Sequence, residues 1–167
     1  IKHALSVEAV MRHFASLNGE DIDKWGIIGL IHDLDYEQYP EQHCTMTRKI
    51  LEEEEWPEEY IRAVVSHGWG ICSETEPQHY MEKVLYTIDE LTGLVTAAVL
   101  IRPSKSIFEL EVKSVKKKWK MKNFAAGANR EVIEKGVAMI GTDLDHVIRE
   151  TINGMGATAK EIGLAGE

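Results

Sequence analysis

Apolar residues recur at intervals of three and four along nearly the whole chain, and this spacing is what most constrains its fold. Val7, Val10, Phe14 and Leu17 form one such stripe, which predicts a helix over residues 2–17. Comparable stripes predict further helices: one carrying Trp25 to Ile31, then 41–54, one opened by Pro57 and ending near His67, 77–100, 106–121, 128–140, 143–154 and a short one at 156–163. No β-type alternation of useful length interrupts them. The sequence therefore predicts an all-α, single-domain helical bundle.

Length and charge narrow the possible classes of protein. The 167 residues, 44% of them hydrophobic and 28% charged, suit one domain spanning 1–167, with a core over about 2–100 and C-terminal helices over about 104–167. A net charge of −9 argues against nucleic acid as a partner. The longest apolar stretch, 91–101, is too short to span a membrane, and no signal peptide is visible. Cys44 and Cys72 form no CxxC motif, so we expect reduced thiols and a cytoplasmic location.

A His-Asp pair at the end of an apolar run is the main candidate for chemistry. His32 and Asp33 directly follow Gly29-Leu30-Ile31. Polar groups at such a position must be hydrogen-bonded, paired with a charge or bound to a metal. Asp89 lies inside a long apolar helix, where an unpaired carboxylate needs a cation. His79 and His146 have polar surroundings and are expected at the surface.

Further histidines lie on the apolar faces of their own predicted helices. The candidate metal ligands are His3, His32, Asp33, His43, His67 and Asp89. Helix bundles build metal sites from side chains on facing helices. A set of imidazoles and carboxylates suits one or two divalent ions of Mn, Fe, Co, Ni or Zn, and the lack of thiolates disfavours a structural zinc site. A single buried histidine, taken alone, is more often a hydrogen-bonded core residue than a ligand.

The order of these ligands resembles a known family. His3 within residues 2–7, the His-Asp pair within 31–33 and Asp89 within 87–92 resemble the ligand pattern of the HD-domain superfamily of metal-dependent phosphohydrolases. The resemblance covers residues 2–100. It implies a helical bundle of the HD-domain type and metal-assisted hydrolysis of a phosphorylated compound.

Two additional histidines extend the resemblance. His43 and His67, between the His-Asp pair and Asp89, resemble the extra ligands of members that bind two metals. The sequence after His67 is Gly68-Trp69-Gly70, without the second histidine and the Gly-Tyr-Pro of members that cleave cyclic dinucleotides. The resemblance therefore implies a dinuclear centre with a different substrate.

The family analogy also suggests catalytic roles. A divalent ion lowers the pKa of bound water and offsets phosphate charge. By analogy, Asp33 bridges two ions or orients the nucleophile. Asp35 and Glu37 follow closely and could act as a base or support a ligand; a solvated loop carboxylate is the simpler interpretation, particularly for Asp35. Asp33 and Glu37 are the predicted catalytic residues.

A basic segment is the second distinctive feature. Between Arg102 and Arg130 lie nine basic residues and only two acidic ones, so the segment carries about +7 in an acidic chain. The simpler interpretation is a solvated helical face. The alternative is a phosphate or nucleotide site, for which Lys116, Lys122 and Arg130 are the candidates.

Several functions are compatible with these features. The leading hypothesis is a divalent-metal phosphohydrolase acting on a small phosphorylated compound or nucleotide. A diiron oxygenase of the same superfamily has a similar ligand set, and a non-catalytic metal-binding regulatory module is the third possibility. Residues after about 125 carry no recognisable motif, and we expect them to close the bundle or to form a homodimer.

Overall fold

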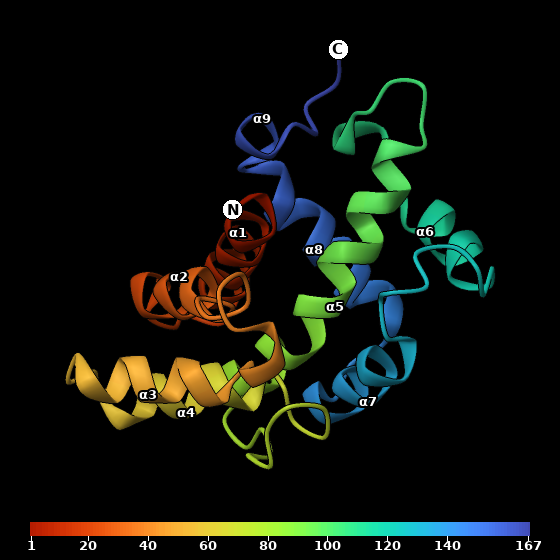
Figure 1. Cartoon of the computed structure of the whole chain (residues 1–167). Helices are drawn as coiled ribbons and strands as arrows, with labels where there is room; N and C mark the ends of the chain where they lie inside the picture. Colours follow the sequence, from red (N-terminus) through yellow and green to blue (C-terminus); the bar gives the residue numbers. More distant parts are fainter.

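Two helices from different parts of the chain organise the fold, which a computed structural model describes for residues 1–167. Helix α1 (Lys2–Leu17) packs against α2 (Ile22–Ile31), α5 (Tyr80–Leu100) and α8 (Leu144–Gly156). Helix α5, the longest, also contacts α4, α6 and α7, and it runs through the middle of the molecule in Figure 1. The packing of α1 on α5 places the first residues of the chain next to residues from its middle.

The remaining helices surround this pair. They are α3 (Thr45–Glu53), α4 (Glu58–Ser66), α6 (Val112–Trp119), α7 (Arg130–Ile140) and α9 (Ala159–Ile162), with 3₁₀ turns at Pro40–Gln42 and Ile107–Glu109. No strand forms; there are only two isolated bridges between single residues. The predicted all-α fold is confirmed. None of these helices combines the length and the apolar character needed to cross a membrane.

One hydrophobic core joins the two parts of the chain. It contains 32 buried apolar residues, from Val7 in α1 to Leu164 beyond α9. Val7, Val10 and Phe14 of the first predicted stripe are all buried, whereas Leu17 is 51% exposed. Because each such side chain contributes about 1.5–3 kcal/mol on burial, the C-terminal helices stabilise the same core that positions the N-terminal ones.

Some helix boundaries differ from the prediction. The third helix begins at Thr45 rather than near 41, because His43 has an extended backbone and Cys44 a positive φ of 70°. Helix α5 begins at Tyr80, three residues after Pro77, with His79 as its N-cap. Asp21 caps α2 by accepting a hydrogen bond from the backbone of Lys24.

Candidate metal centre

All six predicted ligands meet at one place, although they come from five segments of the chain. His3 lies in the first turn of α1, and Asp89 lies in the middle of α5. The other four lie where helices end or begin: His32 and Asp33 directly after α2, His43 just before α3 and His67 at the end of α4. Helix ends position these side chains because the backbone can turn there without breaking internal hydrogen bonds of the helix.

The first ligand group combines two histidines and two carboxylates. It consists of His3, His32, Asp33 and Asp89. Asp89 Oδ1 lies 2.7 Å from His3 Nε2 and 3.0 Å from His32 Nε2, and Asp33 Oδ2 lies 3.2 Å from His32 Nε2. His32 is fully buried, whereas 43% of the His3 side chain is exposed at the rim. These atoms are close enough to coordinate one cation.

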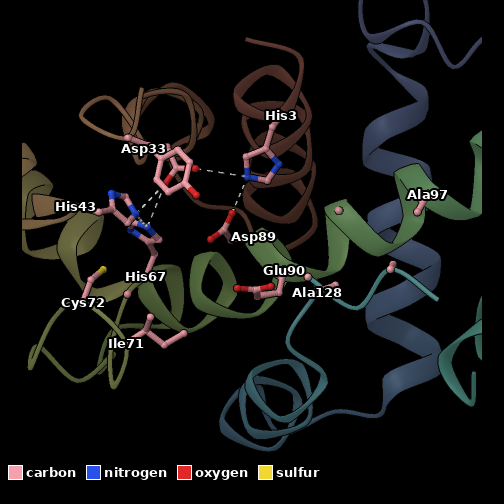
Figure 2. A pocket seen from close by; sticks show the side chains of 15 residues that line it. His3, Asp33, His43, His67, Ile71, Cys72, Asp89, Glu90, Ala97 and Ala128 are labelled. Atoms are coloured by element: carbon pink, nitrogen blue, oxygen red, sulfur yellow. Dashed lines mark hydrogen bonds and ion pairs between the residues drawn. The ribbon is translucent and has the colours of Figure 1, made fainter. Parts of the chain in front are cut away.

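The second group shares Asp33 with the first. Asp33 Oδ1 lies 3.2 Å from His43 Nε2 and 3.3 Å from His67 Nε2, while its other oxygen faces the first group. Figure 2 shows His3 and Asp89 on one side of Asp33 and the other two histidines on the other side. The arrangement offers two adjacent cation positions joined by one carboxylate.

Hydrogen bonds at the opposite ring nitrogen orient three of the imidazoles. His32 Nδ1 donates to the Gly29 carbonyl, and His67 Nδ1 donates to the Val64 carbonyl. His43 Nδ1 donates to Asp35. In the neutral rings, each Nε2 therefore carries the lone pair that a metal requires.

The resulting lone pairs need a positive charge between them. His43 Nε2 and His67 Nε2 lie only 3.1 Å apart, and His32 Nε2 lies 3.0 Å from an oxygen of Asp89. Two lone pairs, or a lone pair and a carboxylate, repel at this distance unless a proton or a cation lies between them. The donor atoms thus fit one or two metal ions.

The pKa values of these groups reflect the same crowding. Burial lowers the pKa of His32, but the carboxylates of Asp89 and Asp33 outweigh burial and hold that pKa well above its usual value. Burial raises the pKa values of Asp33 and Asp89, but the neighbouring histidines outweigh it and keep both well below the usual range. In the absence of metal, the protonated histidines and the ionised carboxylates therefore stabilise one another.

Asp35 supports the centre, and the expectation of a solvated loop carboxylate was wrong. Its side chain has no exposed surface and accepts hydrogen bonds from His43 Nδ1 at 2.6 Å and from the Thr47 backbone at 2.9 Å. This position fits the alternative interpretation, in which Asp35 supports a ligand. Asp35 became buried because the 3₁₀ turn at Pro40–Gln42 folds residues 43–47 back over it.

The centre opens onto a pocket of about 590 Å³. Five of the six ligands line it; only the buried His32 does not. The remaining lining residues are Tyr36, Gly68, Ile71, Cys72, Glu90, Gly93, Ala97, Ala125, Gly127 and Ala128. A metal centre beside a pocket of this size is accessible to a small molecule, unlike a purely structural site.

The basic candidates do not line this pocket. Lys116 pairs with Asp145 at 2.7 Å, and Lys122 is exposed. Arg130 donates its guanidinium hydrogens to backbone carbonyls of Trp119, Met121, Phe124, Ala125 and Ala128. Arg130 therefore holds the loop before α7 and has no donors left for a phosphate. The structure does not support a phosphate site formed by these three residues.

Glu37 does not line the pocket of the candidate centre. Its side chain is exposed and lines a neighbouring cavity together with His3, Asp33 and Tyr36. Its catalytic role stays a prediction. His79 and His146 are exposed, as predicted.

Sequence reasoning missed the opposite wall of the pocket. Glu90 and the small residues of the 125–128 loop line it, and the backbone N–H of Asn129 donates to Glu90 at 2.9 Å. Burial raises the pKa of Glu90, and this hydrogen bond opposes the shift. The sequence signal for this wall was the run Ala125-Ala126-Gly127-Ala128, which follows a basic helix. Its small side chains can bury little surface in a core, so the run could have been interpreted as the lining of a pocket.

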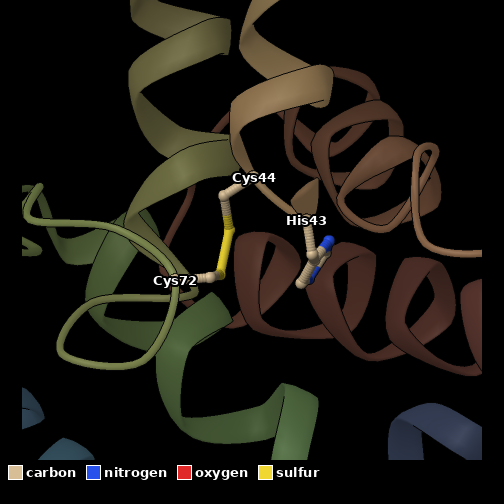
Figure 3. Close-up of side chains that lie close together, drawn as sticks. All are labelled: His43, Cys44 and Cys72. Atoms are coloured by element: carbon tan, nitrogen blue, oxygen red, sulfur yellow. A yellow bond between two sulfur atoms is a disulfide. The ribbon is translucent and has the colours of Figure 1, made fainter. Parts of the chain in front are cut away.

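A disulfide lies next to the second ligand group. Cys44 and Cys72, 28 residues apart, are bonded, so the expectation of reduced thiols was wrong (Figure 3). Cys44 directly follows His43, and a Cβ atom placed on Gly68, directly after His67, would lie 2.2 Å from the Cys72 sulfur. The approach of His43 to His67 brings the two cysteines together, which their spacing in the sequence does not reveal.

Comparison with known proteins adds no relative: no protein-family model, curated protein or solved structure matches this chain. The site is therefore interpreted from its own geometry.

Proposed function

We propose that this protein is a dinuclear, divalent-metal-dependent phosphohydrolase of the HD-domain type. The observation that carries the proposal is the shared carboxylate: Asp33 directs Oδ2 toward the first ligand group and Oδ1 toward the second. Sites with two adjacent metals recur in enzymes that hydrolyse phosphate esters. The open pocket of about 590 Å³ supports catalysis on a small molecule rather than a structural role.

The residues divide the work of holding the metals. His3, His32 and Asp89 would hold one ion and His43 and His67 the other, with Asp33 contributing to both. Bound divalent ions would supply Lewis acidity, which polarises a phosphate ester and lowers the pKa of water. The Gly29 and Val64 carbonyls fix the rings of His32 and His67, so these ligands need little reorganisation on binding.

The metals would also provide the only positive charge at the substrate phosphate. No Lys or Arg lines the pocket. Removal of the metal should therefore abolish both phosphate binding and catalysis, because no cationic side chain of the pocket can bind the phosphate in its place. This argues for a substrate with a single, small phosphate group.

Metal content and hydrolysis of two variants test the proposal. Purified wild-type protein should bind close to two ions of Mn, Fe, Co, Ni or Zn per chain and release phosphate from phosphomonoesters. His43→Ala should retain about one ion, because the first group is intact, and Asp33→Ala should lose both, because it removes an oxygen from each group. Circular dichroism checks that both variants remain helical.

Other outcomes would contradict the proposal. Equal metal content in all three proteins would show that the six residues are structural. Two irons with oxygen consumption and no phosphate release would replace hydrolysis with the oxygenase chemistry that the ligand set also permits.

A further inference from the structure

Glu90 is the only charged residue of the pocket outside the proposed ligand set. It follows the ligand Asp89 in α5, and Figure 2 shows its carboxylate beside Asp89 and Ala128. One oxygen, Oε2, accepts the hydrogen bond from the Asn129 backbone. The other oxygen, Oε1, has no hydrogen-bond or ion-pair partner in the protein. Glu90 thus presents a fixed acceptor to whatever fills the pocket.

The rest of the wall offers almost nothing else to a polar ligand. Outside the ligand set, Glu90 and Tyr36 are the only lining residues with a free polar side-chain group. The loop side is formed by Ala125, Gly127 and Ala128, which have no polar side-chain atoms. Among the side chains on this side of the pocket, only Glu90 can therefore replace the hydrogen bonds that a polar ligand group loses to water.

Arg130 makes this wall rigid. Its five hydrogen bonds to carbonyls join the end of α6 to the loop, and its guanidinium lies 5.9 Å from the centre of the Trp119 ring. Ala125 has a positive φ of 46°, a conformation that alanine rarely adopts without such support. A wall held this way discriminates between ligands because it cannot easily repack around the wrong one.

We infer that Glu90 binds the leaving group of the substrate and selects small phosphomonoesters whose leaving group carries a hydroxyl or ammonium group and no second anion. This inference rests on the proposed phosphohydrolase function. A hydroxyl or ammonium hydrogen would satisfy Oε1. A second anionic group would instead meet the Glu90 carboxylate with no Lys or Arg in the lining to offset the repulsion.

A matched set of alkyl phosphates tests the inference. The compounds have two- to four-carbon chains that end in a methyl, hydroxyl, ammonium or carboxylate group, so only the terminal chemistry differs. In metal-loaded wild-type protein, kcat/KM for the hydroxyl and ammonium compounds should exceed that for the methyl compound by about tenfold or more, as expected for a hydrogen bond to a charged group. The carboxylate compound should be the poorest.

Two substitutions separate the role of Glu90 from that of its position. In Glu90→Ala, the ratios of kcat/KM between compounds should fall toward one. Glu90→Gln retains an acceptor for Asn129, so the preference for hydroxyl should persist in part while that for ammonium is lost. Glu131→Gln, an exposed glutamate of α7, is the matched control and should keep the wild-type ratios.

Two results would overturn the inference. In one, kcat/KM of the wild type is the same whatever the terminal group. In the other, Glu90→Ala lowers kcat/KM by the same factor for all four compounds. If wild-type protein hydrolyses none of them, the proposed function fails, and calorimetric binding of the same compounds to metal-loaded wild type and Glu90→Ala decides the inference. A binding preference that depends on Glu90 supports it, and equal binding overturns it.

Discussion

His43 donates its Nδ1–H to Asp35 across 2.6 Å, and Asp35 has no exposed surface. The second Asp35 oxygen accepts the backbone N–H of Thr47 at 2.9 Å. This carboxylate therefore fixes both the orientation of a proposed metal ligand and the start of α3. Such partners of ligating histidines typically change metal affinity by about 10–100-fold when removed.

Asp35→Asn should weaken metal binding at the second group selectively. The asparagine oxygen can still accept from His43, but its NH₂ group would then face the Thr47 N–H, and two donors cannot bond to each other. We expect metal content to fall from about two ions toward one after dialysis against a weak chelator, with a lower unfolding midpoint. Glu41→Gln, an exposed charge change in the same loop, is the control. Full retention of both ions in Asp35→Asn would show that His43 needs no such support.

The sequence predicted which six side chains come together better than it predicted their surroundings. Helical spacing placed His3 and Asp89 on apolar faces, and these two meet because α1 packs on α5. His43 was assigned to a helix, but it lies before one, in a turn that depends on the disulfide partner and on Asp35. Spacing along a single segment cannot reveal a contact of this kind.

The second half of the chain shows the same limit. Helices α7 and α8 were predicted from their apolar stripes, and the structure contains both. The contribution of the loop before α7 to the pocket depends on the hydrogen bonds of Arg130, a residue that the sequence suggested for phosphate. The positive charge of Arg130 indicated that it would donate hydrogen bonds to oxygen atoms. The fold determined that these oxygens are backbone carbonyls.

Metal binding should become weaker as the pH falls, because protons and metal compete for His32. Burial lowers the pKa of His32, but the Asp89 and Asp33 carboxylates outweigh it and raise this pKa, so the metal-free ring holds its proton more tightly than an ordinary imidazole and metal must displace that proton. Calorimetry in buffers of different ionisation enthalpy should therefore detect proton release on binding. Binding without proton release at about pH 6, below the usual pKa of histidine, would contradict the raised pKa.

Stability of the metal-free protein should depend on pH in the matching direction. The raised pKa of His32 gives stabilisation that is fully present below the unfolded value, about 6.5, and is lost as the pH rises through the folded value. The lowered pKa values of Asp33 and Asp89 give stabilisation that is lost as the pH falls below about 4. Urea unfolding of chelator-treated protein should show both decreases, and His32→Gln should reduce the alkaline one, to which the raised pKa of His43 also contributes.

Reduction of the Cys44–Cys72 bond should destabilise the fold and weaken the second ligand group. A crosslink over 28 residues stabilises by about 3–4 kcal/mol in the chain-entropy description. Cys44, which has a positive φ directly after His43, would also be free to relax and move that ligand. A dithiol reductant should lower the unfolding midpoint of the wild type and leave a Cys44→Ser/Cys72→Ser variant unchanged. Two reactive thiols in the folded, untreated protein would contradict the bond.

Substitution by alanine should have opposite effects on stability at two different glycines. A Cβ atom on Gly136 of α7 would lie 1.9 Å from Thr87 Oγ1 and 2.7 Å from Thr87 Cβ, inside the contact between α7 and α5. Gly93 of α5 has no neighbouring atom within 4 Å of that position. Gly136→Ala should destabilise by about 1–3 kcal/mol through overpacking, whereas Gly93→Ala should stabilise by about 0.5–1 kcal/mol through helix propensity.

The close approach of Thr87 to Gly136 can be tested further with a double variant. Thr87 is fully buried, and its hydroxyl donates to the Lys83 carbonyl within its own helix. Removal of the hydroxyl therefore breaks no hydrogen bond to a residue outside α5. If the clash is the cause, Thr87→Ala should recover part of the stability lost in Gly136→Ala, and the two changes should be non-additive in urea unfolding. Strictly additive effects would show that α7 and α5 adjust independently, and the packing that places the Arg130 loop over the pocket would then be looser than the structure indicates.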